Sequence, residues 1–138
     1  RYVVSERHLL DAFAKALRAT RRGEAVADGL AMETLLYAAG TRQIDVATGI
    51  GPSVKTETVA LVGATTGDAD ALRDALREIG EAVADDAFPT PDVDAVRAFY
   101  DVGDAELAAA SGDGDAAATM AALELLVRER VALLDVRK

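Results

Sequence analysis

The chain of 138 residues has no cysteine, no tryptophan and a single histidine, and aromatic residues make up only 4% of it. Without cysteine there is neither a disulfide framework nor a thiolate nucleophile or metal ligand. A Ser-His-Asp triad could use only His8, because the chain has no other histidine. Nothing near His8 in the sequence resembles a nucleophile, so we interpret it as a partly exposed helix residue. These absences disfavour most enzymes. We therefore expect no catalytic residue, no metal and no cofactor.

Long hydrophobic runs are also missing. No stretch reaches the roughly 18 apolar residues that a membrane span needs, although 51% of the residues are hydrophobic. No secretory signal is present either. We therefore expect a cytoplasmic protein that makes no membrane contact.

Lysine is scarce and aspartate abundant, with 3 Lys against 12 Arg, 15 Asp against 9 Glu, and a net charge of −9. This bias suggests a high-salt cytoplasm, where a strongly charged surface keeps a protein in solution, although a high-GC genome would also produce it. The charge is unevenly placed: residues 1–55 carry a net +2 and residues 56–138 a net −11. The basic part is the first place to look for contact with an acidic partner.

The hydrophobic pattern predicts several helices and two strands. Helices are expected at about 5–20, 29–39, 41–48, 68–83, 92–99, 104–110 and 116–134. Residues 1–4 resemble the end of a strand. Residues 57–64 (ETVALVGA) are apolar on both faces, which is typical of a central strand. The length predicts one domain, residues 1–138. The mixture of helices and strands predicts an α+β fold.

Two motifs resemble ligand sites but fail on their decisive residue. Residues 49–56 (GIGPSVKT) approach a phosphate loop, yet Val54 stands where the second glycine is required. Asp113, Asp115 and Glu124 match three positions of a calcium loop, but an alanine replaces its glycine. We interpret these aspartates as helix caps.

The most informative stretch is residues 32–44 (METLLYAAGTRQI). An apolar helix stopped by Gly40 is followed by a helix that begins with a hydroxyl, a guanidinium and an amide, from Thr41, Arg42 and Gln43. Free backbone N–H groups at such a corner attract phosphate, and guanidinium and amide groups pair with phosphates or base edges. Alternatively, the hydroxyl merely caps the helix and Arg42 pairs with Glu33 or Asp45.

Residues 33–44 (ETLLYAAGTRQI) resemble the signature of the small non-catalytic subunit of the KEOPS complex, the PRPK-binding (TPRKB-like) family. Similarity extends to residues 19–23, 57–63, 99–102 and 129–134. Family members usually begin with a further strand and helix, which are absent here. The resemblance implies helices packed on a short mixed β-sheet.

The resemblance also implies a function. KEOPS makes the threonylcarbamoyl modification on adenosine 37 of tRNA, and this family binds the kinase/ATPase subunit and, in archaea, helps recruit tRNA through its 3′ CCA end. It has no catalytic residues and no small-molecule substrate. We therefore expect an accessory KEOPS subunit from an archaeon, and a halophilic one given the composition. The alternative, which the overall acidity suggests, is an adaptor that binds the kinase without touching tRNA. The basic segment 1–55 favours the tRNA-recruiting subunit over this adaptor.

The predicted tRNA site combines two groups of side chains. One is the glycine corner, with Ile44 packing on an unpaired base beside the three polar side chains of Thr41, Arg42 and Gln43. The other is a basic stripe on the first helix, whose members recur at helical spacing and would position the RNA backbone: Lys15, Arg18 and Arg22.

Overall fold

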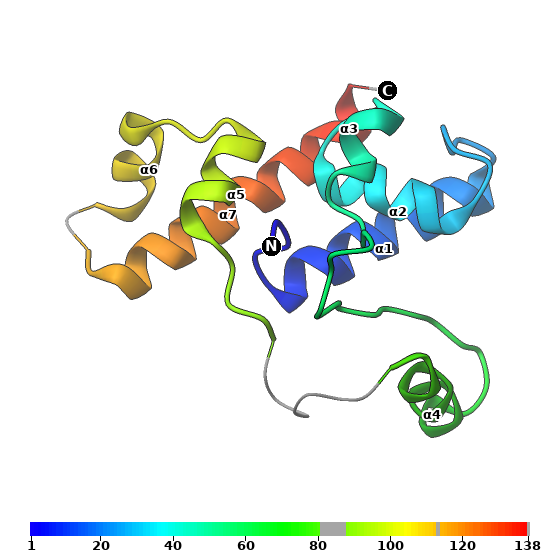
Figure 1. Cartoon of the computed structure of the whole chain (residues 1–138). Helices are drawn as coiled ribbons and strands as arrows, with labels where there is room; N and C mark the ends of the chain where they lie inside the picture. Colours follow the sequence, from blue (N-terminus) through cyan, green and yellow to red (C-terminus); the bar gives the residue numbers. More distant parts are fainter. Residues whose placement is uncertain (81–87, 113, 138) are drawn as a thin grey trace.

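The computed structural model describes residues 1–80, 88–112 and 114–137. Every regular element in these ranges is a helix, as Figure 1 shows. In chain order they are α1 (Glu6–Arg22), α2 (Leu30–Ala39), α3 (Ile44–Thr48), α4 (Ala69–Ile79), α5 (Val93–Tyr100), α6 (Asp104–Ser111) and α7 (Ala116–Val136). None of these described helices is long and apolar enough to cross a membrane.

The α1 helix begins where its sequence predicts and continues to Arg22, two residues beyond the predicted end. The Ser5 hydroxyl accepts a hydrogen bond from the His8 backbone N–H at 3.1 Å, which satisfies one of the unpaired donors of the first turn. At the other end Gly23 has φ 71°, and the Glu24 N–H donates to the Ala19 carbonyl at 2.9 Å. A glycine in this left-handed conformation terminates a helix by turning the chain out of its axis.

Small side chains decide which face of α1 is buried. The hydrophobic spacing of Leu10, Phe13 and Leu17 helps to predict the helix, but Leu10 is 47% exposed. The buried face instead carries one histidine and three alanines, namely His8, Ala12, Ala16 and Ala19. Alanines let two helices approach closely, and α2 packs Tyr37 and Ala38 against this face.

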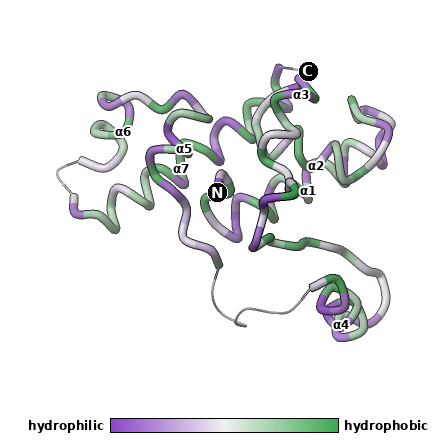
Figure 2. Tube along the Cα trace, in the orientation of Figure 1, coloured by the Kyte–Doolittle hydropathy of each residue, from purple (hydrophilic) through white to green (hydrophobic). Residues whose placement is uncertain are grey.

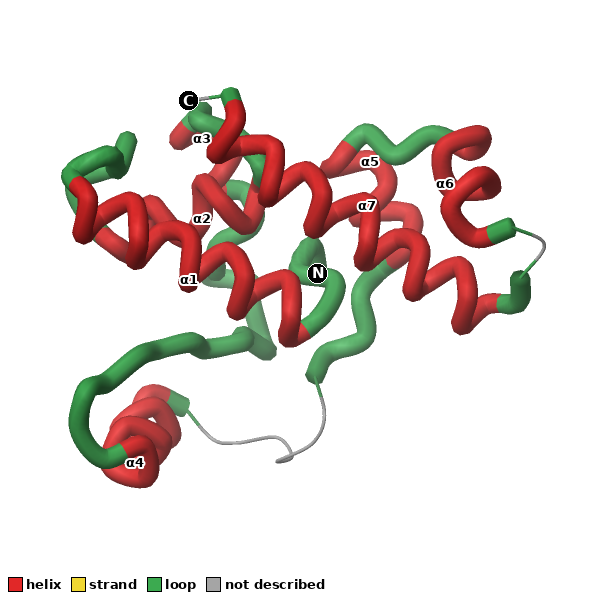
Figure 3. The backbone as a smooth tube through the Cα atoms, turned by 180° about the vertical axis from the view of Figure 1, so that it is seen from behind, coloured by secondary structure: helices red, strands yellow, loops and turns green. Residues whose placement is uncertain are grey.

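The longest helix, α7, joins the two halves of the core. Its N-terminal half packs Leu123 and Val127 against residues of α5 and α6. Its C-terminal half packs Val131 and Leu134 against α1 and α2. In Figure 3, α7 accordingly runs beside α1 and continues past α5 to α6. Leu123, Val127, Val131 and Leu134 thus form a buried stripe along this helix. Asp115 caps it by accepting from the Ala118 N–H at 3.0 Å. Asp113 lies outside the described residues.

The predicted α+β fold with helices on a mixed β-sheet is wrong: no strand is present in the described ranges. Residues 57–64 run as an irregular segment, and residues 1–4 lead directly into α1. A strand is stabilised by hydrogen bonds to a neighbouring strand. Because every regular element in the described ranges is a helix, residues 57–64 have no neighbouring strand to pair with there, and β-branched composition alone is not enough to form a strand.

The α4 helix stands apart from the others in Figures 1 and 3. Asp68 caps it by accepting from the Asp70 N–H at 2.9 Å, but none of its residues is buried. Hydrophilic and hydrophobic residues mix around it in Figure 2. Leu72 lies close to Gly63 of the preceding segment, where a Cβ on Gly63 would come within 3.3 Å of its side chain. The helix was predicted to continue to 83; residues 81–87 lie outside the described part.

His8 is fully buried, which corrects the expectation of a partly exposed histidine. Its Nδ1 accepts the Val4 N–H at 3.2 Å, and its Nε2 lies 2.8 Å from the Ala38 carbonyl oxygen. A carbonyl can only accept, so the imidazole is neutral with its proton on Nε2. Burial lowers the pKa of His8, outweighing the opposite influence of the Ala38 carbonyl and of the Asp11 and Glu124 carboxylates.

This neutral histidine predicts acid-sensitive folding. The unfolded chain takes up a proton near the ordinary pKa of 6.5 more readily than the folded one. The stabilisation that comes from the neutral, buried His8 should therefore be fully present above that pH, and the free energy of unfolding should decrease as the pH drops below it. Urea denaturation at pH values between about 7.5 and 5.5 measures this, since carboxylates titrate mostly below that window.

His8→Gln is the control, because the chain has no other histidine. The variant should be less stable at pH 7.5 but show no slope between the two pH values. A slope that persists unchanged in His8→Gln would contradict the assignment.

Candidate nucleic-acid interface

The glycine corner forms as its sequence predicts. Gly40 has φ 65°, and its N–H donates to the Tyr37 carbonyl at 3.0 Å while the Thr41 N–H donates to the Leu36 carbonyl at 3.1 Å. These bonds satisfy the last carbonyls of α2. A Cβ on Gly40 would lie 3.4 Å from Cβ of Arg130, so α7 passes directly beside the corner.

The helix after the corner is shorter than predicted. It begins at Ile44 rather than at residue 41 and contains five residues. Thr41 forms the turn before it, because its Oγ1 accepts the Gln43 N–H at 3.1 Å. A helix of about one turn has a small dipole. Ligand contacts here must therefore come from side chains rather than from the helix end.

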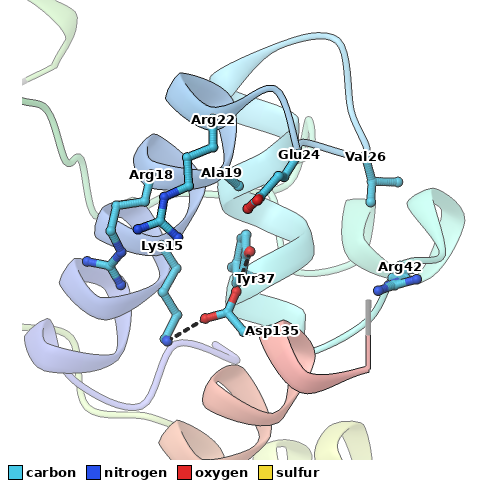
Figure 4. A pocket seen from close by; sticks show the side chains of 9 residues that line it. All are labelled: Lys15, Arg18, Ala19, Arg22, Glu24, Val26, Tyr37, Arg42 and Asp135. Atoms are coloured by element: carbon cyan, nitrogen blue, oxygen red, sulfur yellow. Dashed lines mark hydrogen bonds and ion pairs between the residues drawn. The ribbon is translucent and has the colours of Figure 1, made fainter.

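A pocket of about 490 Å³ opens between α1, the loop after it, α2 and the end of α7, as Figure 4 shows. Its size lies within the range of small-ligand sites. Four of the residues that line it are cationic: Lys15, Arg18, Arg22 and Arg42. The other residues are Ala19, Glu24, Val26, Tyr37 and Asp135. In Figure 4 the α1 cations form one side and Arg42 lies across from them.

Three of these cations are exposed and have no acidic partner among the described residues. Arg18, Arg22 and Arg42 make no ion pair with any residue in the described ranges, and the expected alternative pairing of Arg42 with Glu33 or Asp45 does not form. An arginine presents a planar fork of donors that matches phosphate oxygens. The pocket therefore offers unneutralised donors to an anionic ligand.

Asp135 from the far end of the chain is held inside this cationic pocket. The Tyr37 hydroxyl donates to one of its carboxylate oxygens at 2.6 Å, and Lys15 Nζ donates to the other at 2.8 Å. Burial, followed by this hydrogen bond to Asp135, raises the pKa of Tyr37, so its hydroxyl remains a donor at neutral pH. Two donors thus fix the orientation of the carboxylate.

Buried Glu33 shapes the edge of the pocket. It is only 1% exposed, and its Oε2 accepts the Val26 N–H at 3.0 Å and the Ala27 N–H at 2.8 Å. These bonds hold the loop between α1 and α2, whose Glu24 and Val26 face the pocket. Backbone donors that would otherwise lack partners near the core are thereby satisfied.

Four of the seven predicted site residues meet in one pocket: Lys15, Arg18, Arg22 and Arg42. Thr41, Gln43 and Ile44 do not line it. Gln43 and Ile44 are exposed beside Arg42, with Ile44 49% exposed, and Thr41 is half-buried.

Sequence reasoning missed the pocket residues Glu24, Tyr37 and Asp135. No local pattern brings Asp135 to Lys15, which lies 120 positions away. The basic stripe and the glycine corner were visible in the sequence, whereas their shared acidic residue was not.

Comparisons with known proteins gave one match. A family model described as kinase binding protein CGI-121 matches residues 1–135. No match was found among curated proteins or among solved structures.

The corner itself can be tested through backbone strain. Gly40→Ala should lower the free energy of unfolding by about 1–2 kcal/mol, because a side chain is disfavoured at positive φ. Urea denaturation measures the loss. The control is Gly80→Ala, at an extended φ of −165° with open space around it. Its stability should change by less than about 0.5 kcal/mol. Equal losses in the two variants would contradict the strain argument.

Proposed function

Because the chain belongs to the CGI-121 family of kinase-binding proteins, we propose that it is the small accessory subunit of the KEOPS complex, acting in the cytoplasm. It binds the kinase/ATPase subunit and recruits tRNA through the 3′ CCA end for threonylcarbamoyl modification of adenosine 37. The chemistry belongs to other subunits, and this chain contributes binding.

The pocket is the observation that supports a tRNA role. Among residues 1–55, the basic part of the chain, four cations converge on one cavity although the protein carries a net charge of −9. Three of them, Arg18, Arg22 and Arg42, have no acidic partner in the described ranges. The carboxylates of Glu24 and Asp135 also line the pocket, so the four cations leave an excess of positive charge there, which costs free energy unless an anion neutralises it. A phosphodiester chain passing through the pocket meets that need.

The contacts beside the pocket suit unpaired bases. Ile44 and Gln43 are exposed next to Arg42, so an apolar surface and an amide lie beside the pocket residue Arg42. Binding through phosphates alone weakens by about 0.7 log units per contact for each log unit of salt. Packing and base-edge hydrogen bonds are less salt-dependent, and they allow binding in a concentrated cytoplasm.

Charge reversal at the corner should remove tRNA binding. Arg42→Glu places a carboxylate across from Arg18 and Arg22, and Ile44→Glu removes the packing surface, so each should weaken binding by about 100-fold or more. Lys15→Ala should cost less, because Lys15 already donates to Asp135. Trimming the CCA end should cost as much as Ile44→Glu. Filter binding measures these affinities.

Arg7→Glu is the matched control, since Arg7 is exposed on the same helix as Arg18 but does not line the pocket. It should bind tRNA within about twofold of wild type once salt screens distant charges. Circular dichroism first establishes that each variant is folded. If folded Ile44→Glu binds like wild type, or if removing CCA has no effect, the adaptor function without tRNA contact is the better description.

The kinase partnership is a separate expectation. The full chain should form a stable one-to-one complex with the KEOPS kinase subunit of its host, measured by light scattering on the mixed proteins at micromolar concentration. Arg42→Glu should form the same complex, because tRNA recruitment uses the pocket. Two unassociated species in the mixture would contradict the proposal for the kinase.

A further inference from the structure

Residues 1–4 pack on the core without forming regular secondary structure. Val4 is only 6% exposed and belongs to the same core cluster as Val96 of α5. The ring of Tyr2 stacks on that of Phe99, also in α5, with 4.7 Å between the ring centroids. This short segment therefore covers an apolar side of α5.

The backbone of the segment is tied to α1 by a hydrogen bond whose acceptor can take up a proton. The Val4 N–H donates to Nδ1 of His8 at 3.2 Å, and this contact is buried. Nε2 of the same ring donates to the Ala38 carbonyl at 2.8 Å, so turning the ring over would break both bonds. Nδ1 can accept from Val4 only while it carries no proton itself.

A second proton on the ring would convert Nδ1 into a donor. Two N–H groups would then face each other, and the Val4 N–H would be buried without an acceptor. A buried charge beside an unpaired buried donor is strongly unfavourable. Movement of residues 1–4 away from the ring relieves both problems, because water can then accept from Nδ1 while the bond from Nε2 to Ala38 remains.

The groups around His8 do not compensate for its burial. Burial is the largest influence on the pKa of His8 and lowers it. Asp11 on α1 and Glu124 on α7 favour the charged ring, but Arg128 on α7 opposes it and lies 2.7 Å from Asp11 and 3.9 Å from Glu124. From α5 the Tyr100 hydroxyl lies 3.5 Å from Nε2, and α2 contributes a backbone carbonyl. The ring is therefore neutral as long as the segment covers it.

We propose that His8 is a proton-operated latch for residues 1–4: proton binding at Nδ1 releases this segment from α5 while the helices stay packed. Release frees a short irregular segment, whereas unfolding exposes the whole core, so local opening requires less free energy than unfolding. Acidification therefore uncovers Val96 and Phe99 before the protein unfolds. This behaviour is independent of the proposed tRNA and kinase roles.

Native-state hydrogen exchange on the full chain tests the latch without any substitution. Once released, His8 takes up a proton with the ordinary pKa of 6.5, so opening becomes about tenfold more favourable between about pH 7.5 and 5.5. The protection factor of the Val4 amide should fall by that factor. Low urea concentrations should leave it unchanged, because local opening exposes little surface.

The amide of Val127 in α7 is the internal reference, because its residue is fully buried and should exchange only through global unfolding. Its protection should fall as urea is added. The latch is overturned if the Val4 amide is unprotected at pH 7.5, if its protection does not change with pH, or if urea lowers it as steeply as that of Val127.

A tryptophan at position 2 gives an independent measurement, because the chain has no tryptophan of its own. Tyr2→Trp keeps an aromatic ring over Phe99. Its fluorescence emission should shift to longer wavelength as the pH falls from about 7.5 to 5.5, while the helical circular dichroism stays constant. If both signals change together, the opening is global and the latch does not exist.

Two second-site variants of Tyr2→Trp serve as matched controls. His8→Gln introduces an amide that cannot be protonated, so the emission should no longer depend on pH. Asp92→Asn removes the carboxylate that lies 3.7 Å from Arg1 and leaves His8 in place, so the shift should persist. A shift that survives in His8→Gln, or disappears in Asp92→Asn, means that another group controls the segment and overturns the inference.

Discussion

The carbonyl oxygen of Ala38 accepts two hydrogen bonds in the interior, from His8 Nε2 and from the Tyr100 hydroxyl, both at 2.8 Å. These bonds join the start of α1, the end of α2 and the end of α5 at one atom. A buried carbonyl with two donors is well satisfied, and removing either donor would leave buried polar groups without full partners. Two residues later Gly40 turns the chain, so these hydrogen bonds hold the end of α2 from which the segment with Arg42 continues.

The α7 helix contacts the end of α5, the glycine corner and the cationic pocket. Arg130 donates from Nε to the Tyr100 carbonyl at 2.7 Å and from Nη2 to the Asp101 carbonyl at 3.1 Å, and so ties α7 to the end of α5. Its Cβ faces Gly40. Slightly further along the same helix, Asp135 enters the cationic pocket. The helix that packs in the core therefore also positions Asp135 in the pocket, so a displacement of α7 would move both the core contacts and this carboxylate.

The pocket concentrates positive charge in a protein that is acidic as a whole. A net charge of −9 is unfavourable for a partner made of phosphates, but screening removes most long-range repulsion at high ionic strength. What remains are contacts within a few ångströms, and there the pocket presents Arg18, Arg22 and Arg42. Asp135 places one negative charge among these cations, where it pairs with Lys15.

The sequence by itself determined the local features. The caps of α1, the positive φ at Gly40 and the buried stripe of α7 follow from residues within a few positions of one another, and the basic stripe of α1 is visible in its spacing. The family resemblance carried by residues 33–44 was likewise local and is confirmed by the match over residues 1–135. Tertiary structure decided the rest. Whether residues 57–64 form a strand depends on a neighbouring strand, which no sequence window contains, and His8 is buried because α2 and α5 close over it. The pocket joins Lys15 to Asp135 across 120 positions, since only the packing of α7 against α1 brings the two charges within hydrogen-bond distance.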